Sequence, residues 1–100
     1  MDEGNPSGLI ARLREAVERG LREPDQIESL LHEAVIELHS AQARALTLQR
    51  EIADALDRGS DETGELIRAF RAANLAAAAI QEPERRLREH YERLTVAGRR

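Results

Sequence analysis

Apolar residues recur along most of the chain at spacings typical of helices, and they predict three helical segments. In the first segment they return to one face at every turn, which predicts a short amphipathic helix over residues 9–22. Its apolar positions are Leu9, Leu13, Ala16, Val17 and Leu21. We expect Pro24 to end this helix, because the residue before a proline is pushed out of the helical region. Residues 1–8 are mostly turn formers, and we expect a flexible tail there.

The second and third segments share a heptad pattern. Apolar positions of the second segment are Ile27, Leu31, Ala34, Leu38, Ala41, Ala45, Leu48, Ile52 and Ala55, with alternating steps of four and three residues. The third segment repeats this spacing with Leu66, Phe70, Ala73, Ala77, Ile80, Glu84, Leu87, Tyr91 and Leu94, and only Glu84 interrupts its apolar character. Sustained heptad spacing is typical of coiled-coil helices, so we predict helices over about residues 26–57 and 62–95.

Local signals mark the ends of these two helices. Asp25 and Glu28 have the spacing of a capping box at the start of the second helix. Gly59 can take the left-handed conformation that ends a helix, and Ser60 or Asp61 can cap the helix that follows. Pro83 lies inside the third segment, where a proline removes a backbone hydrogen bond at a cost of ~3 kcal/mol. We therefore predict a kink or short break near residues 81–83.

The two heptad series pair with each other when the chain folds back at the Gly59 turn. Ile52 then lies opposite Phe70, and Leu31 lies opposite Tyr91. Large residues mostly face small ones, as interdigitated packing requires. The sequence thus predicts an all-α fold, an antiparallel coiled-coil hairpin preceded by a short amphipathic helix. Residues 9–97 are expected to form one domain, with residues 98–100 as a tail.

Apolar residues also lie away from the heptad seam. They are Leu30, Val35, Ile36, Leu46 and Leu75, together with Ile67 and the alanines that flank the seam residue Ala77 in the run 76–79. Two helices cannot bury so wide an apolar surface, so we expect the first helix to cover part of it. A second copy of the chain or another helical protein is expected to cover the rest, and the first five of these residues are the predicted interaction surface.

The composition bears on which partners the protein can bind and on its location in the cell. The chain has 100 residues, no cysteine and a net charge of −4, and its 15 basic residues, all arginine, are interleaved with 19 acidic ones. This mixture lacks the basic stripe of a nucleic-acid-binding protein, so no nucleic-acid partner is expected. The absence of cysteine excludes disulfides and thiolate chemistry. No signal segment and no apolar run near ~20 residues is found, and we expect a soluble cytoplasmic protein.

Candidate chemistry is sparse. His32 and His39 are separated by about two turns, ~10 Å, which is too far for one metal ion without a third element. We expect Tyr91 to pack in the seam with its hydroxyl near Glu92 or Arg88. Serines lack a nearby His/Asp arrangement, and the helical chorismate mutases use lysine, which this chain lacks. We therefore expect a non-enzymatic protein without metal or cofactor.

Glu84 is the one charged residue of the seam. We expect it to reach solvent at the Pro83 kink and to pair with Arg44 or Arg85. The alternative is that it sets the register of the helices or contacts a partner.

The order of the predicted helices resembles that of a known family. A short amphipathic helix over residues 9–22 ends at Glu23-Pro24-Asp25. A heptad helix follows with Leu30-Leu31-His32-Glu33 and Ala43-Arg44-Ala45-Leu46, and then a return helix with Asn74-Leu75-Ala76-Ala77-Ala78. Over about residues 9–94 this order resembles the front half of the phage shock protein A family, bacterial relatives of ESCRT-III. The resemblance implies a first helix that binds stressed membrane and a hairpin that polymerises. The implied membrane face is Leu9, Ile10, Leu13, Val17 and Leu21.

Three functions are therefore considered. The preferred one is a non-enzymatic helical hairpin that associates with itself or acts as an adaptor for another helical protein. The alternative is a peripheral membrane-stress protein with its first helix on the membrane surface. The third is a secreted hairpin dimer of the early secreted antigenic target type, although the Trp-x-Gly turn of that family is absent.

Overall fold

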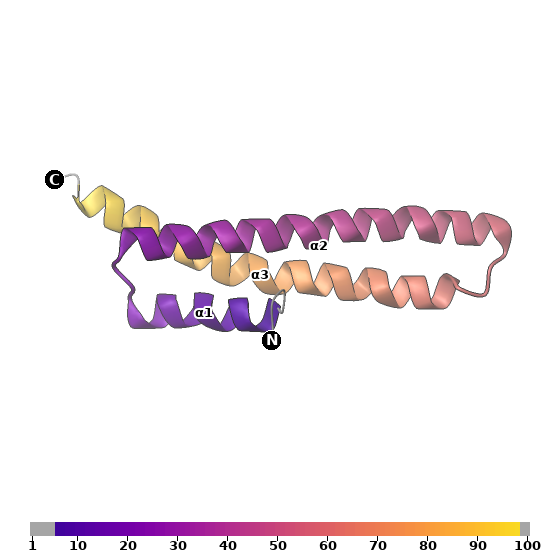
Figure 1. The fold of residues 1–100 in the computed structure, drawn as a ribbon, viewed down its shortest axis with the longest axis horizontal. Coiled ribbons are helices and arrows are strands. Elements are labelled where there is room, and N and C mark those ends of the chain that lie inside the picture. Colours follow the sequence, from indigo (N-terminus) through magenta and orange to yellow (C-terminus); the bar gives the residue numbers. More distant parts are fainter. Residues whose placement is uncertain (1–5, 99–100) are drawn as a thin grey trace.

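The computed structural model describes residues 6–98, and this part of the chain forms three helices and no strand. Helix α1 spans Pro6–Arg19, α2 spans Pro24–Arg58 and α3 spans Thr63–Gly98. Helices α2 and α3 form an antiparallel hairpin, and α1 lies along one end of it, parallel to α3 (Figure 1). The molecule measures 62 by 29 by 16 Å. The predicted all-α hairpin with a preceding helix is confirmed.

Glycine, and not proline, ends α1. Gly20 has φ of 64°, and the amide of Leu21 donates to the carbonyl of Ala16 at 2.9 Å. Gly59 ends α2 in the same way, with φ of 66°. This left-handed cap satisfies carbonyls that the last turn would leave free, and glycine adopts it without a steric penalty. The prediction for Gly59 is confirmed, whereas the prediction that Pro24 ends the first helix is wrong.

Helix α2 begins at Pro24, two residues before the predicted start. Pro24 occupies the first helical position, where its fixed φ is favourable and its missing amide hydrogen costs nothing. The N-cap residue is Glu23, whose side chain makes no capping hydrogen bond. The predicted capping box is therefore wrong: Asp25 lies within the first turn, and Glu28 is engaged with α3.

The turn between the arms is held by a serine. The amide of Glu62 donates to Oγ of Ser60 at 3.1 Å, and Oγ1 of Thr63 donates to the Ser60 carbonyl at 3.0 Å. These bonds arrange the chain directly before α3 begins. Ser60 thus stabilises the turn and does not cap α3, which begins at Thr63, so the prediction that Ser60 or Asp61 caps the next helix is wrong.

Helix α3 continues through Pro83 without a break, so the predicted break is wrong. In Figure 1 the part of α3 after this point, light orange to yellow, runs at a different slope and passes behind α2. Pro83 is buried and borders a hollow with Arg14, Val17 and Glu18 of α1. Packing of the proline ring beneath α1 offsets the lost backbone hydrogen bond.

The helices extend beyond the predicted limits at both ends of the chain. Residues 6–8, predicted as part of a tail, form the first turn of α1, and Gly98 belongs to the last turn of α3. The remaining tail residues, 1–5 and 99–100, lie outside the described residues.

The heptad seam forms as predicted. Every one of its positions on α2 and α3 is buried or half-buried, including Leu31, Leu38 and Tyr91. The hydroxyl of Tyr91 reaches Glu28, one turn from Leu31, and Leu38 borders one hollow with Glu84. These contacts match the predicted pairing of the two arms.

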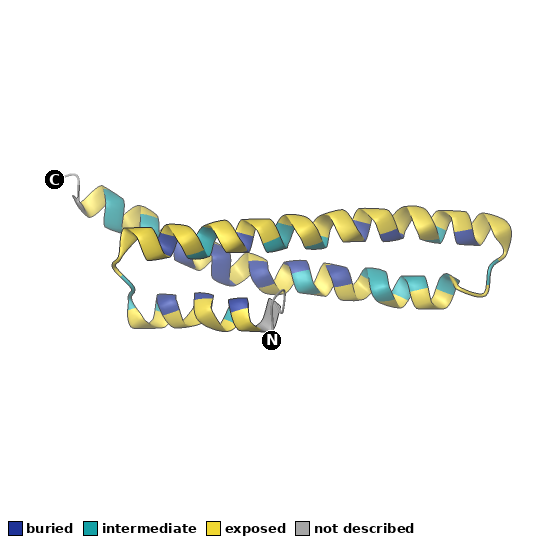
Figure 2. Ribbon diagram, viewed as in Figure 1, coloured by how far each residue is buried: buried dark blue, intermediate teal, exposed yellow. Residues whose placement is uncertain are grey.

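Two separate cores result from the position of α1. We call the part built from α1, residues 24–38 and residues 80–98 the three-helix end, and residues 41–79 the two-helix end. The three-helix end contains the large, fully buried side chains, and the two-helix end has a cluster of Ala45, Leu48 and Ala73. Those large side chains are Leu13, Ile27, Ile80 and Leu87. Figure 2 shows the buried positions of α1 on the side that faces the hairpin.

Candidate interaction surface

The structure leaves four of the five predicted surface residues exposed. Val35 is 38% exposed, Ile36 53%, Leu46 60% and Leu75 70%. Leu30 is half-buried and packs against the core of the three-helix end, so the prediction that it points outward is wrong. This core includes residues of α1, so part of the off-seam apolar surface is buried where the first helix packs, as expected.

Two further large apolar side chains are exposed and were missed. Leu56 is 64% exposed and Val96 is 59% exposed. The exposure of Leu56 could have been predicted from its position in the sequence. It directly follows the seam residue Ala55, and successive residues on a helix lie about 100° apart, so Leu56 is turned away from the seam. The predicted surface residues do not form one patch either. Val35 and Leu46 share a side of α2, whereas Ile36 lies about 100° further around.

An uncharged stripe follows the exposed side of α2. Its eight positions are His32, Val35, His39, Gln42, Leu46, Gln49, Ala53 and Leu56, again in steps of three and four residues. All eight are exposed. His32 and His39, considered above as metal ligands, belong to this stripe. Among the described residues no group of three or more His, Cys, Asp or Glu side chains is placed to hold a metal ion.

The apolar face of α1 is turned into the bundle. Leu13 is fully buried and Leu9 is 3% exposed, while Ile10, Val17 and Leu21 are half-buried against the same core. An ion pair of 2.9 Å between Arg12 and Glu33 joins α1 to α2. The implied membrane face is thus packed against α2 and α3. Within residues 6–98, no helix has the length and apolarity needed to cross a bilayer.

Two polar residues of α3 tie the three-helix end together. Nε2 of His90 donates to the carbonyl of Leu21 at 2.8 Å, which joins α3 to the connection after α1. The hydroxyl of Tyr91 donates to Oε1 of Glu28 on α2. This hydrogen bond, with desolvation and the nearby charges of Glu28 and Asp25, raises the pKa of Tyr91 above its ordinary value of 10.0. The prediction that the hydroxyl reaches Glu92 or Arg88 is wrong.

Glu84 is buried in the seam and is 6% exposed. Its Oε1 lies 3.6 Å from Nη1 of Arg88, one turn further along α3. The predicted partners, Arg44 and Arg85, make no ion pair with it. The expectation that Glu84 reaches solvent is therefore wrong, and its buried carboxylate is paired with a cation of the same helix.

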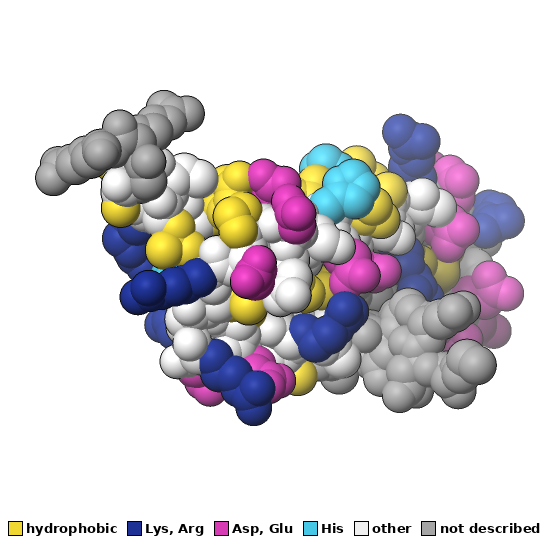
Figure 3. All heavy atoms as spheres, turned by 60° about the vertical axis from the view of Figure 1, so that its left-hand side comes forward, with side chains coloured by type: hydrophobic (Ala, Val, Ile, Leu, Met, Phe, Trp, Pro, Cys, Tyr) yellow, Lys and Arg dark blue, Asp and Glu magenta, His cyan; other side chains and the backbone are white. Residues whose placement is uncertain are grey.

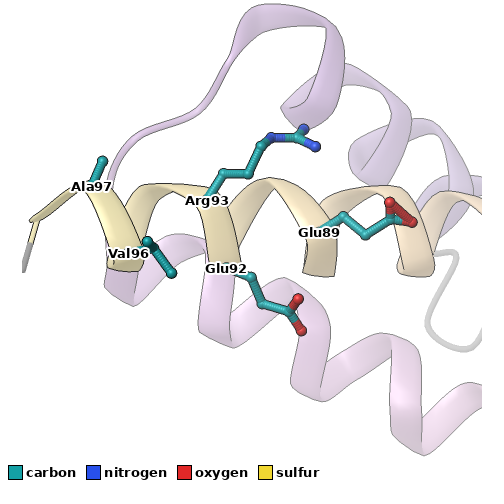
Figure 4. A pocket seen from close by; sticks show the side chains of 5 residues that line it. All are labelled: Glu89, Glu92, Arg93, Val96 and Ala97. Atoms are coloured by element: carbon teal, nitrogen blue, oxygen red, sulfur yellow. The ribbon is translucent and has the colours of Figure 1, made fainter.

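One surface hollow is formed by a single helix. This hollow, of about 550 Å³ near the C-terminal end of α3, is lined by Glu89, Glu92, Arg93, Val96 and Ala97. All five come from one helix, and Figure 4 shows their side chains pointing in different directions. The view of this end in Figure 3 shows acidic and basic groups interspersed, with small apolar areas between them.

Comparison with known proteins adds no further assignment. No family model, no curated protein and no solved structure matches the chain.

Proposed function

We propose that this protein is a non-enzymatic helical hairpin that acts through helix–helix association, with a second copy of itself or as an adaptor for another helical protein. The main support is a belt around the middle of the hairpin, formed by residues 38–49 of α2 and 72–81 of α3. The register of the seam places these two stretches side by side. Arg44 is their one charged residue, in a chain that is 34% charged.

The belt has the physical properties of an association surface. A helical surface that faces only water is usually dense in charge, as are both ends of this hairpin. The belt instead exposes Leu46 by 60% and Leu75 by 70%, among alanine, serine, asparagine and glutamine. Removing such apolar area from water is worth about 25 cal/mol per Å², and small neighbours allow a second helix to approach closely.

A rigid hairpin also lowers the entropic cost of binding. The seam and the core of the three-helix end hold α2 and α3 together, so the belt does not have to be ordered when a partner helix binds. We also propose a cytoplasmic location for the protein, which is compatible with this role.

Light scattering tests the proposal directly. Size-exclusion chromatography with light scattering, over a range of concentrations, is expected to give a mass above 11.2 kDa, or a pull-down is expected to recover a helical partner. Leu46→Glu and Leu75→Glu test the belt, and Val96→Glu is the matched control, because Val96 is 59% exposed but lies outside it. A strict monomer without a partner would contradict the proposal.

The membrane-stress and secreted-dimer alternatives stay predictions. For α1 to bind a membrane through Leu9 and Leu13, it would have to leave the bundle and lose the Arg12–Glu33 and His90–Leu21 contacts. Flotation with anionic liposomes at low salt tests whether the protein binds a membrane, since electrostatic attraction to such vesicles is strongest at low salt.

A further inference from the structure

Helix α3 carries a second heptad stripe on the side that faces away from the seam. Its positions, in alternating steps of three and four residues, are Glu65, Arg68, Ala72, Leu75, Ala79, Glu82 and Arg86. All seven are exposed, and Leu75 at the centre is 70% exposed, the highest value among the large apolar side chains described. The stripe is roughly 30 Å long. No part of the hairpin seam uses these positions.

The stripe is complementary to itself when it is turned end for end about Leu75. Arg68 of one copy then lies opposite Glu82 of the other, and Glu65 lies opposite Arg86. Ala72 lies opposite Ala79, and Leu75 meets its own counterpart. The pairing places every charge of the stripe opposite a charge of the other sign. Within one chain, Glu82 and Arg86 already pair at 3.2 Å, which holds both charges on this side of the helix.

We propose that two copies of the chain bind each other through this stripe, with the two α3 helices antiparallel and a two-fold axis at Leu75. A two-fold interface uses the same patch on both partners, which is the condition that this stripe fulfils. Alanine on both sides of the axis permits close approach of the helices, and the outer charges select the antiparallel register. The proposal rests on the proposed function and names its partner.

The position of α1 supports the same surface. Helix α1 packs against α3 around Pro83, and its residues Arg14 and Glu18 border a hollow with Glu82 and Arg86. Towards the turn between the arms, Ala72 and Ala79 on the neighbouring part of α3 stay exposed. Helix α3 of the second copy would therefore cover Ala72 and Ala79, which lie next to the part of α3 that α1 covers.

The uncharged stripe of α2 is the competing surface. Its eight positions include no charge, so nothing in it selects a second copy or a direction of pairing. Dimerisation through α2 is therefore an outcome that the test must separate from dimerisation through α3.

Disulfide cross-linking makes this separation, because the chain has no cysteine of its own. Leu75→Cys is expected to form a disulfide-linked dimer under mild oxidation, since the two-fold axis places the two residues together. Leu46→Cys is the matched control, because Leu46 is 60% exposed on α2. We expect Leu75→Cys to cross-link at least about tenfold faster, because the dimer raises the effective thiol concentration. Equal rates, or faster linking through Leu46→Cys, would overturn the inference.

Charge reversal tests the register in the full-length chain. Glu82→Arg sets like charges opposite Arg68 at both ends of the dimer, and we expect the dissociation constant to rise about tenfold. The double variant Arg68→Glu/Glu82→Arg restores opposite charges and is expected to recover the native value. Arg50→Glu on α2 is the control, and circular dichroism reports whether each variant is folded.

The outcomes also separate the inference from the proposed function. A dimer that survives Glu82→Arg unchanged, or that the double variant fails to restore, overturns the inference and leaves helix–helix association standing. A strict monomer that also binds no helical partner overturns both.

Discussion

The two ends of the molecule share one hairpin and one heptad seam, yet they are covered to different degrees. At the three-helix end, α1 closes over the hairpin, and Leu13, Ile27 and Leu87 are fully buried. At the two-helix end, the best-covered seam residues are mostly alanines, and Leu46, Leu56 and Leu75 are 60–70% exposed. Helix α1 spans roughly 20 Å of an α2 that is roughly 50 Å long. One end thus has a core of large buried side chains, and the other leaves large apolar side chains exposed.

This difference teaches where stability and association reside. Two helices bury only the narrow stripe that each turns to the other, so a third helix is needed to enclose large side chains. We therefore expect the three-helix end to supply most of the folding free energy. The two-helix end leaves apolar side chains exposed, and the proposed association would cover them.

The largest expected effect compares leucines of the two ends. Leu87→Ala removes a fully buried side chain of the three-helix end and is expected to lower the free energy of unfolding by about 2–5 kcal/mol. Leu48→Ala at the two-helix end should cost about 2 kcal/mol or less, because water can enter the space beside Ala45 and Ala73. Urea denaturation at one fixed, low protein concentration measures both. Equal losses would mean that the two cores are equivalent.

A smaller effect is expected at the two glycine caps. Gly20 ends α1 and Gly59 ends α2, both with positive φ, and a Cβ atom at either would meet nothing within 4 Å. Substitution by alanine should therefore lower the free energy of unfolding by about 1–2 kcal/mol at each position, which is the cost of holding a residue with a Cβ atom in the left-handed conformation. Thermal unfolding measures the losses. Gly64→Ala, within α3 and equally open, is the control and should stabilise the protein by up to about 1 kcal/mol. A loss at Gly64 as large as at the caps would contradict this explanation.

The smallest effect concerns the link between Tyr91 and Glu28 at the three-helix end. Because the carboxylate accepts the hydroxyl proton and repels a phenolate, the pKa of Tyr91 is raised in the folded protein. The stabilisation is fully present below the ordinary pKa of 10.0 and is lost as the pH rises through the raised folded value. Tyr91 is the only tyrosine, so phenolate absorbance reports it directly. Glu28→Gln removes the negative charge and should move the pKa of Tyr91 down towards its ordinary value, and an unchanged titration would exclude the charge of Glu28 as a cause.

Much of the hairpin could be predicted because its signals are local or periodic. The heptad spacing identified both seam stripes, and the left-handed cap at Gly59 followed from the residue type. The same reasoning was wrong at Pro24, because Gly20 provides an equivalent cap four residues earlier. At Pro83 it was wrong about a break but not about a kink: α3 is continuous, and it runs at a different slope after this residue (Figure 1). Burial of the proline ring beside α1 depends on tertiary packing, which a local rule does not include.

The candidate surface was predicted only in part. The off-seam residues Val35, Ile36, Leu46 and Leu75 are exposed, but their grouping depends on how the helices are turned and on which of them α1 covers. Leu30 shows this dependence, since its sequence spacing matches an outward position until α1 packs against it. The partners of Tyr91 and His90 come from residues 63 and 69 positions away, so they could not be read from neighbouring residues.

The sequence by itself determined the helices, the turn at Gly59 and the pairing of the two arms. These features follow from the geometry of 3.6 residues per turn and from the conformational freedom of one glycine. Tertiary structure alone decided that α1 turns its apolar face into one end of the hairpin and leaves the other end open. The reason is physical: an amphipathic helix specifies that a face must be buried but not which surface buries it, and that choice depends on the shape of the groove that α2 and α3 form together.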